Sequence, residues 1–135
     1  MASDMKVQLN QISPSTSEAT VGRHRVLIDR PAAKGGADMG PMGGELFLAA
    51  VGGCFMSNLL AAIKARNASI SGIRAEVMGT VAESPARFAG VELHLTAKGG
   101  SEEFERLVEV ADRGCIMMNT LRGKLDVRVR TTVTA

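Results

Sequence analysis

Two cysteines, Cys54 and Cys115, are the residues whose types and neighbours best indicate chemistry. Cys54 follows Gly52-Gly53 inside an apolar stretch, and Cys115 follows Gly114. A thiol at a helix start has a lowered pKa, because free backbone N–H groups and the helix dipole stabilise its thiolate. Two such cysteines far apart in the sequence are typical of a nucleophile and its resolving thiol. The alternative for Cys54 is a buried structural role, since a free cysteine also behaves as a small hydrophobic residue.

Other uses of these cysteines find less support in the sequence. A zinc site is disfavoured because there is no Cys-x-x-Cys motif and His24 and His94 have no paired spacing. A histidine-assisted cysteine hydrolase needs a histidine beside Cys54, and His94 lies in an alternating pattern that places it at the surface. The glycine-rich stretch 35–44 has neither phosphate-binding glycine motif. We therefore expect no metal and no bound cofactor.

Composition limits the class of protein. The 135 residues suit one domain spanning 1–135, with 45% hydrophobic and 22% charged residues. A net charge of +2 and 3% aromatic residues argue against a nucleic-acid partner. Two cysteines are too few for a secreted disulfide scaffold, the N-terminus has no signal-peptide pattern, and Lys64 and Arg66 close the most apolar segment. We expect a cytoplasmic protein that does not span a membrane.

The chemistry must be positioned by a mixture of strands and helices. Alternation predicts strands over 5–12 and 18–29, and a loop follows over 30–44. Residues 45–67 predict a long helix that is apolar on nearly every side and therefore largely buried. The pair Gly52-Gly53 predicts either a close approach of another backbone or a helix restart before Cys54.

The second half predicts a pair of long antiparallel strands over 70–82 and 88–97, then a helix over 101–113. A short helix over 115–122 and a strand over 125–134 complete the chain. This order of elements indicates an α+β architecture. A small chain with few aromatic residues and an apolar helix also gains from dimerisation, so we expect a homodimer.

Two segments resemble the OsmC/Ohr family, named for osmotically inducible protein C and the organic hydroperoxide resistance protein. Residues 40–55, GPMGGELFLAAVGGCF, are similar to the family's Gly-Pro-x-Pro-x-Glu-Leu helix with its small-small-Cys centre. Residues 115–127, CIMMNTLRGKLDV, are similar to its Cys-Pro-x-Ser-x-x-x-Arg-Gly-x-x-Asp-Val run. The resemblance extends from about residue 20 to the C-terminus. It implies an intertwined homodimer in which antiparallel sheets surround a long buried central helix.

The resemblance also implies a function and roles for individual residues. Cys54 would be the peroxidatic thiol that attacks an organic hydroperoxide, and Cys115 the resolving thiol. A dithiol, typically lipoyl-bound, would reduce the resulting disulfide. The family supports its thiolate with an Arg–Glu pair, for which Arg23 and Glu45 are the candidates here.

The chain departs from the family pattern at several positions. Ile116 replaces the usual proline after the second cysteine, and Gly43 replaces the second proline of the first motif. Glu45 precedes Cys54 by nine residues, a spacing that fits OsmC-like members rather than the Ohr branch. Nine helical residues amount to about 900°, so on an unbroken helix Glu45 faces away from Cys54 and serves another role. Arg25 and Arg30 are alternatives to Arg23.

These observations lead to two hypotheses of different class. The first is a cysteine-based thiol peroxidase of the OsmC-like branch, acting on organic hydroperoxides in antioxidant stress response. The second is a dimeric, stress-related protein of the same fold that binds a small ligand or another protein and whose cysteines do no turnover. The fate of the thiols after peroxide treatment distinguishes the two.

Overall fold

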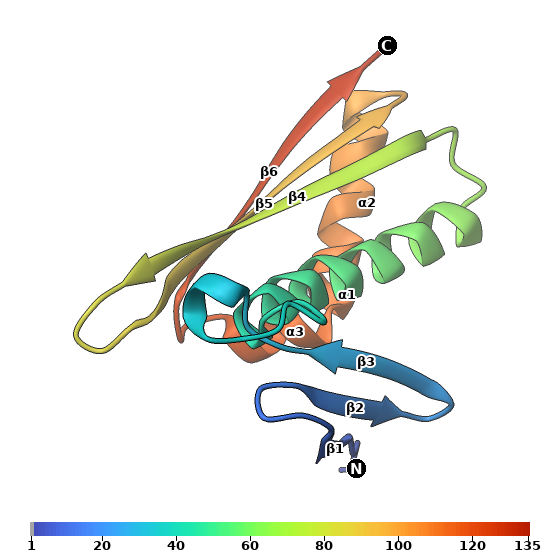
Figure 1. Cartoon of the computed structure of the whole chain (residues 1–135). Coiled ribbons are helices and arrows are strands. Elements are labelled where there is room, and N and C mark those ends of the chain that lie inside the picture. The colour runs from blue at the N-terminus through green and yellow to red at the C-terminus, as the bar shows by residue number, and fades with distance from the viewer. Residues whose placement is uncertain (1) are drawn as a thin grey trace. The chain divides into compact units, whose positions relative to one another are not determined.

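The computed structural model describes residues 2–135, and the chain divides into two compact units, residues 1–47 and 48–135. We call these the N-terminal unit and the C-terminal unit. The N-terminal unit contains strands β1 (Gln8–Gln11), β2 (Ser17–Val21) and β3 (His24–Ile28), the short 3-10 helix η1 (Ala32–Lys34) and the start of helix α1 (Gly43–Ala65) (Figure 1). The three strands form an antiparallel sheet in the order β1-β2-β3.

The predicted strand over 18–29 is in fact two strands, so that part of the prediction is wrong. The chain turns at Gly22-Arg23, and Val21 pairs with His24 across β2 and β3. Gly22 adopts a φ of +59°, which a two-residue hairpin turn requires and which glycine adopts without a steric penalty. Glu18 on β2 and Arg25 on β3 form an ion pair at 3.7 Å.

The glycine-rich segment after β3 is a loop, as predicted, and one buried carboxylate organises it. Asp29 is 3% exposed and accepts hydrogen bonds from the hydroxyl of Thr16 (2.9 Å) and from the backbone N–H of Arg30 (2.7 Å). The N–H groups of Ala37 and Met39 also donate to it, each at 3.2 Å. Burial alone would raise the pKa of Asp29, but these hydrogen bonds outweigh it and lower the pKa to about 2.

The C-terminal unit combines one sheet with helices. Its elements after α1 are β4 (Ser71–Ala82), β5 (Arg87–Lys98), α2 (Ser101–Gly114), α3 (Ile116–Leu121) and β6 (Asp126–Thr134). The predicted helices and strands of this half are confirmed to within one or two residues. The strand order is β4-β5-β6, with β4 and β5 antiparallel as predicted. However, β6 runs parallel to β5, because the α2–α3 connection returns the chain to the starting end of β5. The expectation of purely antiparallel sheets is therefore wrong for this sheet.

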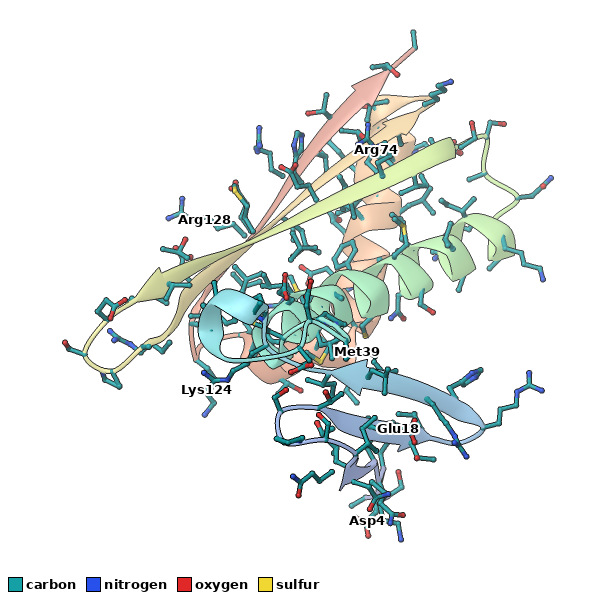
Figure 2. The ribbon with its side chains drawn as sticks, viewed as in Figure 1. Asp4, Glu18, Met39, Arg74, Lys124 and Arg128 are labelled. Carbon is teal, nitrogen blue, oxygen red and sulfur yellow. The ribbon has the colours of Figure 1, made fainter. Side chains whose placement is uncertain are left out.

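The two faces of this sheet differ in polarity. Alternate residues of β5, including Val91, Leu93 and Leu95, are buried in the core. The opposite face is polar, and its ion pairs include Arg130 with Glu92 at 3.5 Å. His94 lies on this polar face as predicted, with its Nε2 2.9 Å from the hydroxyl of Thr132. Arg74 on β4 and Arg128 on β6 belong to the same sheet (Figure 2).

Helix α1 is unbroken from Gly43 to Ala65, so the predicted helix restart before Cys54 is wrong. The other expectation for the glycine pair, close approach of another backbone, is also not met, because the neighbour found at Gly52 is a side chain. A Cβ at Gly52 would lie 2.6 Å from Cγ2 of Val77 on β4, whereas a Cβ at Gly53 would meet nothing within 4 Å. Gly52 thus lets the helix approach the sheet.

The burial of α1 is smaller than predicted. Within this one chain, 28% of its most apolar 18-residue window is buried, and the side chain of Leu60 is 50% exposed. By length and hydropathy α1 meets the criteria for a membrane-crossing helix, as the core helix of a soluble protein can also do. The prediction that it is largely buried is therefore wrong for a single chain, which leaves apolar surface on α1 uncovered.

Candidate active site: the Cys54–Cys115 pair

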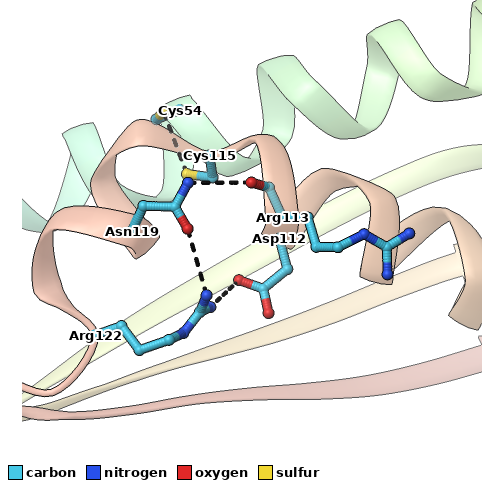
Figure 3. A network of polar contacts seen from close by, with 6 residues as sticks. All are labelled: Cys54, Asp112, Arg113, Cys115, Asn119 and Arg122. Atoms are coloured by element: carbon cyan, nitrogen blue, oxygen red, sulfur yellow. Dashed lines mark hydrogen bonds and ion pairs between the residues drawn. The ribbon is translucent and has the colours of Figure 1, made fainter.

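The structure brings together the two cysteines that the sequence singled out. The thiol of Cys115 donates a hydrogen bond to the sulfur of Cys54, and the two Sγ atoms lie 3.3 Å apart (Figure 3). Both cysteines are free thiols. Cys54 lies on α1 and is partly exposed, whereas Cys115 is fully buried at the junction of α2 and α3. Cys54 is therefore the more exposed residue of the pair, and Cys115 is the buried one.

The surroundings shift the two pKa values in opposite directions. Burial raises the pKa of Cys54, but hydrogen bonds from the Met117 N–H, the Cys115 thiol and the Ile116 N–H outweigh it, so the pKa is lowered. Burial raises the pKa of Cys115, and the neighbouring Cys54 raises it further. The pair thus favours a thiolate on Cys54 and a thiol on Cys115. A partly exposed thiolate is the form in which cysteine acts as a nucleophile.

The N–H groups that favour the Cys54 thiolate belong to another helix. The sequence assigned them to a restart of the helix that carries Cys54, but they lie at the start of α3. Cys115 is the residue that caps this helix, as its predicted place at a helix start required.

A polar network braces the α2–α3 corner that holds Cys115. The guanidinium of Arg122 forms a short ion pair with Asp112 and donates to Oδ1 of Asn119 at 3.4 Å. The amide of Asn119 donates to the carbonyl of Arg113 at 3.1 Å (Figure 3). Arg122 therefore links α2 to α3 at the corner that carries Cys115.

Asn58 is a residue of the site that the sequence reasoning missed. Its Nδ2 donates to the backbone carbonyl of Cys54 at 2.9 Å and lies 3.9 Å from Cys54 Sγ. Asn58 follows Cys54 by one helical turn, and that spacing is the signal that could have identified it.

The other two candidate residues lie in the N-terminal unit. Arg23 is exposed in the Gly22-Arg23 turn between β2 and β3. Glu45 lies in the first turn of α1, and its Oε1 accepts a hydrogen bond from the Met42 N–H at 2.9 Å. Because α1 is unbroken, the nine-residue spacing places Glu45 and Cys54 on opposite sides of the helix axis. The structure therefore gives Glu45 a helix-start contact.

The described residues contain no cluster of side chains that could bind a metal ion. Among residues 2–135, no three or more His, Cys, Asp or Glu side chains come close enough together to hold a metal ion. What the arrangement can do is redox chemistry between two sulfurs, since a bond between them needs only a small movement.

The fold and this cysteine pair define a class of protein. Residues 35–130 match the family model described as OsmC-like protein, and the chain belongs to this family. No curated protein matches the sequence.

Solved structures agree with this placement. The chain is similar to an OsmC-like protein from Mycoplasma pneumoniae, with a TM-score of 0.86, 17% identity and 100% of each chain covered. It is also similar to an organic hydroperoxide resistance protein from Elizabethkingia anophelis, with a TM-score of 0.74, 24% identity and coverage of 99% and 100%. A third, from Bacillus subtilis, is also an organic hydroperoxide resistance protein, with a TM-score of 0.64, 24% identity and coverage of 95% and 98%. At these identities the similarity shows a shared fold.

Proposed function

We propose that the protein is a cysteine-based thiol peroxidase that reduces organic hydroperoxides, with Cys54 as the peroxidatic thiol and Cys115 as the resolving thiol. The observation that carries the proposal is the 3.3 Å separation of the two sulfurs, with the partly exposed one favoured as a thiolate. The names of the structural neighbours from Elizabethkingia and Bacillus support the same activity by analogy.

The reaction balances with these two residues and an external dithiol. The Cys54 thiolate attacks the distal peroxide oxygen, the S–O bond forms as the O–O bond breaks, and the departing alkoxide takes a proton to become an alcohol. Cys54 is then a sulfenic acid. The Cys115 sulfur attacks it, the S–S bond forms and water leaves. A dithiol, for which a lipoyl group is the proposed class, reduces this disulfide and is itself oxidised to a disulfide.

The proposed reaction uses no metal, flavin or haem. The proposal keeps Arg23, with Arg25 and Arg30 as alternatives, as the cation beside the thiolate. Glu45 stays the candidate carboxylate for holding this arginine, although it does not face Cys54 from its own place on α1.

The proposed working form is a cytoplasmic homodimer. The uncovered apolar surface of α1, including the half-exposed Leu60, supports a second copy of the chain as the cover. A monomeric mass by light scattering at micromolar concentration would contradict this part of the proposal.

The decisive experiment counts free thiols before and after one equivalent of cumene hydroperoxide. The peroxidase loses both thiols per chain, and a dithiol restores them. Cys54→Ser is expected to abolish peroxide consumption while the protein stays folded. Cys115→Ser is expected to leave a sulfenic acid on Cys54 that dimedone traps. Unchanged thiols in the parent protein, or full activity of Cys54→Ser, would refute the proposal.

A second candidate function has one observation in its favour. The N-terminal unit has a polar cavity of about 400 Å³ lined by Arg30 and Lys34, by the hydroxyls of Ser15 and Ser17, and by the first residues of α1. Such a cavity favours a protein that binds a small ligand and does no turnover. Thiols that survive cumene hydroperoxide unchanged would support this reading.

A further inference from the structure

Asn58 is the side chain that reaches both parts of Cys54. Its Nδ2 donates to the Cys54 carbonyl at 2.9 Å and lies 3.9 Å from Cys54 Sγ. An amide nitrogen carries two hydrogens, so one can serve the carbonyl while the other points to the sulfur. A donor held in this way favours a thiolate over a thiol on Cys54.

The other end of the same amide lies against the segment that carries Cys115. A Cβ at Gly114 would lie 3.2 Å from Oδ1 of Asn58, closer than ordinary van der Waals contact. Gly114 directly precedes Cys115 and is the last residue of α2. The absence of a side chain there leaves the space that the Asn58 amide occupies. Asn58 therefore lies between the helix of one cysteine and the residue before the other.

The groups that act on the Cys54 sulfur in the C-terminal unit are mostly neutral donors. The titratable group among them is Cys115, and the others are the N–H groups of Ile116 and Met117 at the start of α3. The charged residues of α1 nearest in sequence to Cys54 are Glu45 in the first helical turn and Lys64 in the last, both more than two turns away from it. With so few partners, the loss of one neutral donor has a measurable effect.

We propose that Asn58 is a positioning residue that fixes the Cys54 sulfur toward Cys115 and donates an N–H to its thiolate, in a space kept open by Gly114. The inference rests on the proposed function in one respect, namely that Cys54 is the reactive thiol. It adds a specific role for an amide that the two cysteine motifs do not contain.

The experiment measures the pH dependence of Cys54 alkylation by iodoacetamide on the reduced protein, with the modified residue identified by mass spectrometry. Asn58→Leu keeps the size and removes the donor, and its midpoint is expected about half a pH unit or more above that of the parent. Asn58→Asp replaces the donor with a carboxylate, and the midpoint rises further, because a neighbouring negative charge disfavours the thiolate. Ser57→Ala, at an exposed neighbouring position, is the matched control, and its midpoint stays unchanged.

Substitutions at Gly114 provide a second, independent test. Gly114→Ala displaces the Asn58 amide and is expected to raise the Cys54 midpoint in the parent protein. In the Asn58→Ala background the same change meets no amide, so it is expected to have little further effect. This dependence on Asn58 separates a positioning role from a general loss of structure, and circular dichroism confirms that each variant is folded.

Two results would overturn the inference. One is an Asn58→Leu profile that coincides with the Ser57→Ala profile. The other is a Gly114→Ala shift of equal size with and without Asn58. Alkylation requires no peroxide, so a parent protein that fails to consume cumene hydroperoxide refutes the proposed function while the Asn58 shift still stands or falls separately.

Discussion

The sulfurs of Cys54 and Cys115 are 61 positions apart in the sequence and 3.3 Å apart in space. One lies in the middle of a long helix and the other at the corner between two later helices, so the packing of α1 against the α2–α3 corner sets their distance. The two cysteines also differ in pKa. The pKa of the partly exposed Cys54 is lowered, which favours its thiolate, and the pKa of the buried Cys115 is raised, which favours its thiol.

The first prediction concerns the reactivity of Cys54 as the pH changes. Its lowered pKa means that the thiolate persists at pH values below about 8.5, where an ordinary cysteine is mostly protonated. Cys115→Ala removes one donor, and the midpoint of Cys54 alkylation is expected to rise. Rates measured with iodoacetamide between pH 5 and pH 9 check this. A midpoint at or above that of a model thiol peptide would contradict the pKa direction.

The second prediction concerns the brace at the corner that holds Cys115. Asp112→Asn weakens the pairing with Arg122, and the rate of disulfide formation after peroxide treatment is expected to fall several-fold. The pair is largely solvent-exposed, so the free energy of unfolding changes by only about 1 kcal/mol or less. Asp126→Asn, which breaks the exposed pair with Arg128 on β6, is the control and leaves that rate unchanged. Equal rates of disulfide formation in Asp112→Asn and Asp126→Asn would show that the Asp112–Arg122 pair does not contribute to this step.

The third prediction concerns acid stability. The pKa of Asp29 is about 2 in the folded protein and about 3.9 in an unfolded chain. A lowered pKa gives stability that is present above about pH 4 and lost as the pH falls toward 2. Asp29→Asn is therefore expected to be less stable than the parent at pH 7, and the gap narrows between pH 4 and 2. Urea unfolding across this range measures it, with the exposed Asp38→Asn as the control. A gap that is constant with pH would refute the assignment.

The fourth prediction contrasts two adjacent glycines on α1. Gly52→Ala forces a methyl group into Val77 and is expected to destabilise the protein by about 1–3 kcal/mol. Gly53→Ala meets open space in this chain and is expected to stabilise it by about 1 kcal/mol, because alanine favours the helix. Thermal or urea unfolding measures both. In a Val77→Ala background, Gly52→Ala is expected to lower the free energy of unfolding by less. An equally large loss in that background would show that the clash with Val77 is not its cause.

Patterns along the chain predicted the elements where periodicity is strong. The helix over 45–67 is confirmed to within two residues because its apolar stretch is long, and the strands over 70–82 and 88–97 because their alternation of apolar and polar residues extends over many positions. The turn at Gly22-Arg23 was missed, since it occupies only two residues inside a continuous alternating pattern. The parallel direction of β6 follows from the path of the connection, which the composition of a strand does not encode.

The sequence predicted the two cysteines of the candidate site, but it did not predict the groups that surround them. Motif spacing selected Cys54 and Cys115, whose contact depends on tertiary packing. The donors at the start of α3 come from a helix adjacent in space to Cys54 and remote in sequence. Asn58 belongs to neither cysteine motif, and its contact with Cys54 depends on the orientation of its side-chain amide.

Helix α1 combines high apolar content with an early place in the chain. During synthesis its 23 residues are complete before any strand of the sheet that covers one of its sides. At roughly 5–20 residues per second, β6 follows the end of α1 by about 4–14 seconds. For that interval the nascent chain displays a segment with the length and hydropathy of a membrane span. Until β4 and β5 pair and cover one of its sides, α1 is an apolar segment exposed on the nascent chain, and such surface is prone to aggregation.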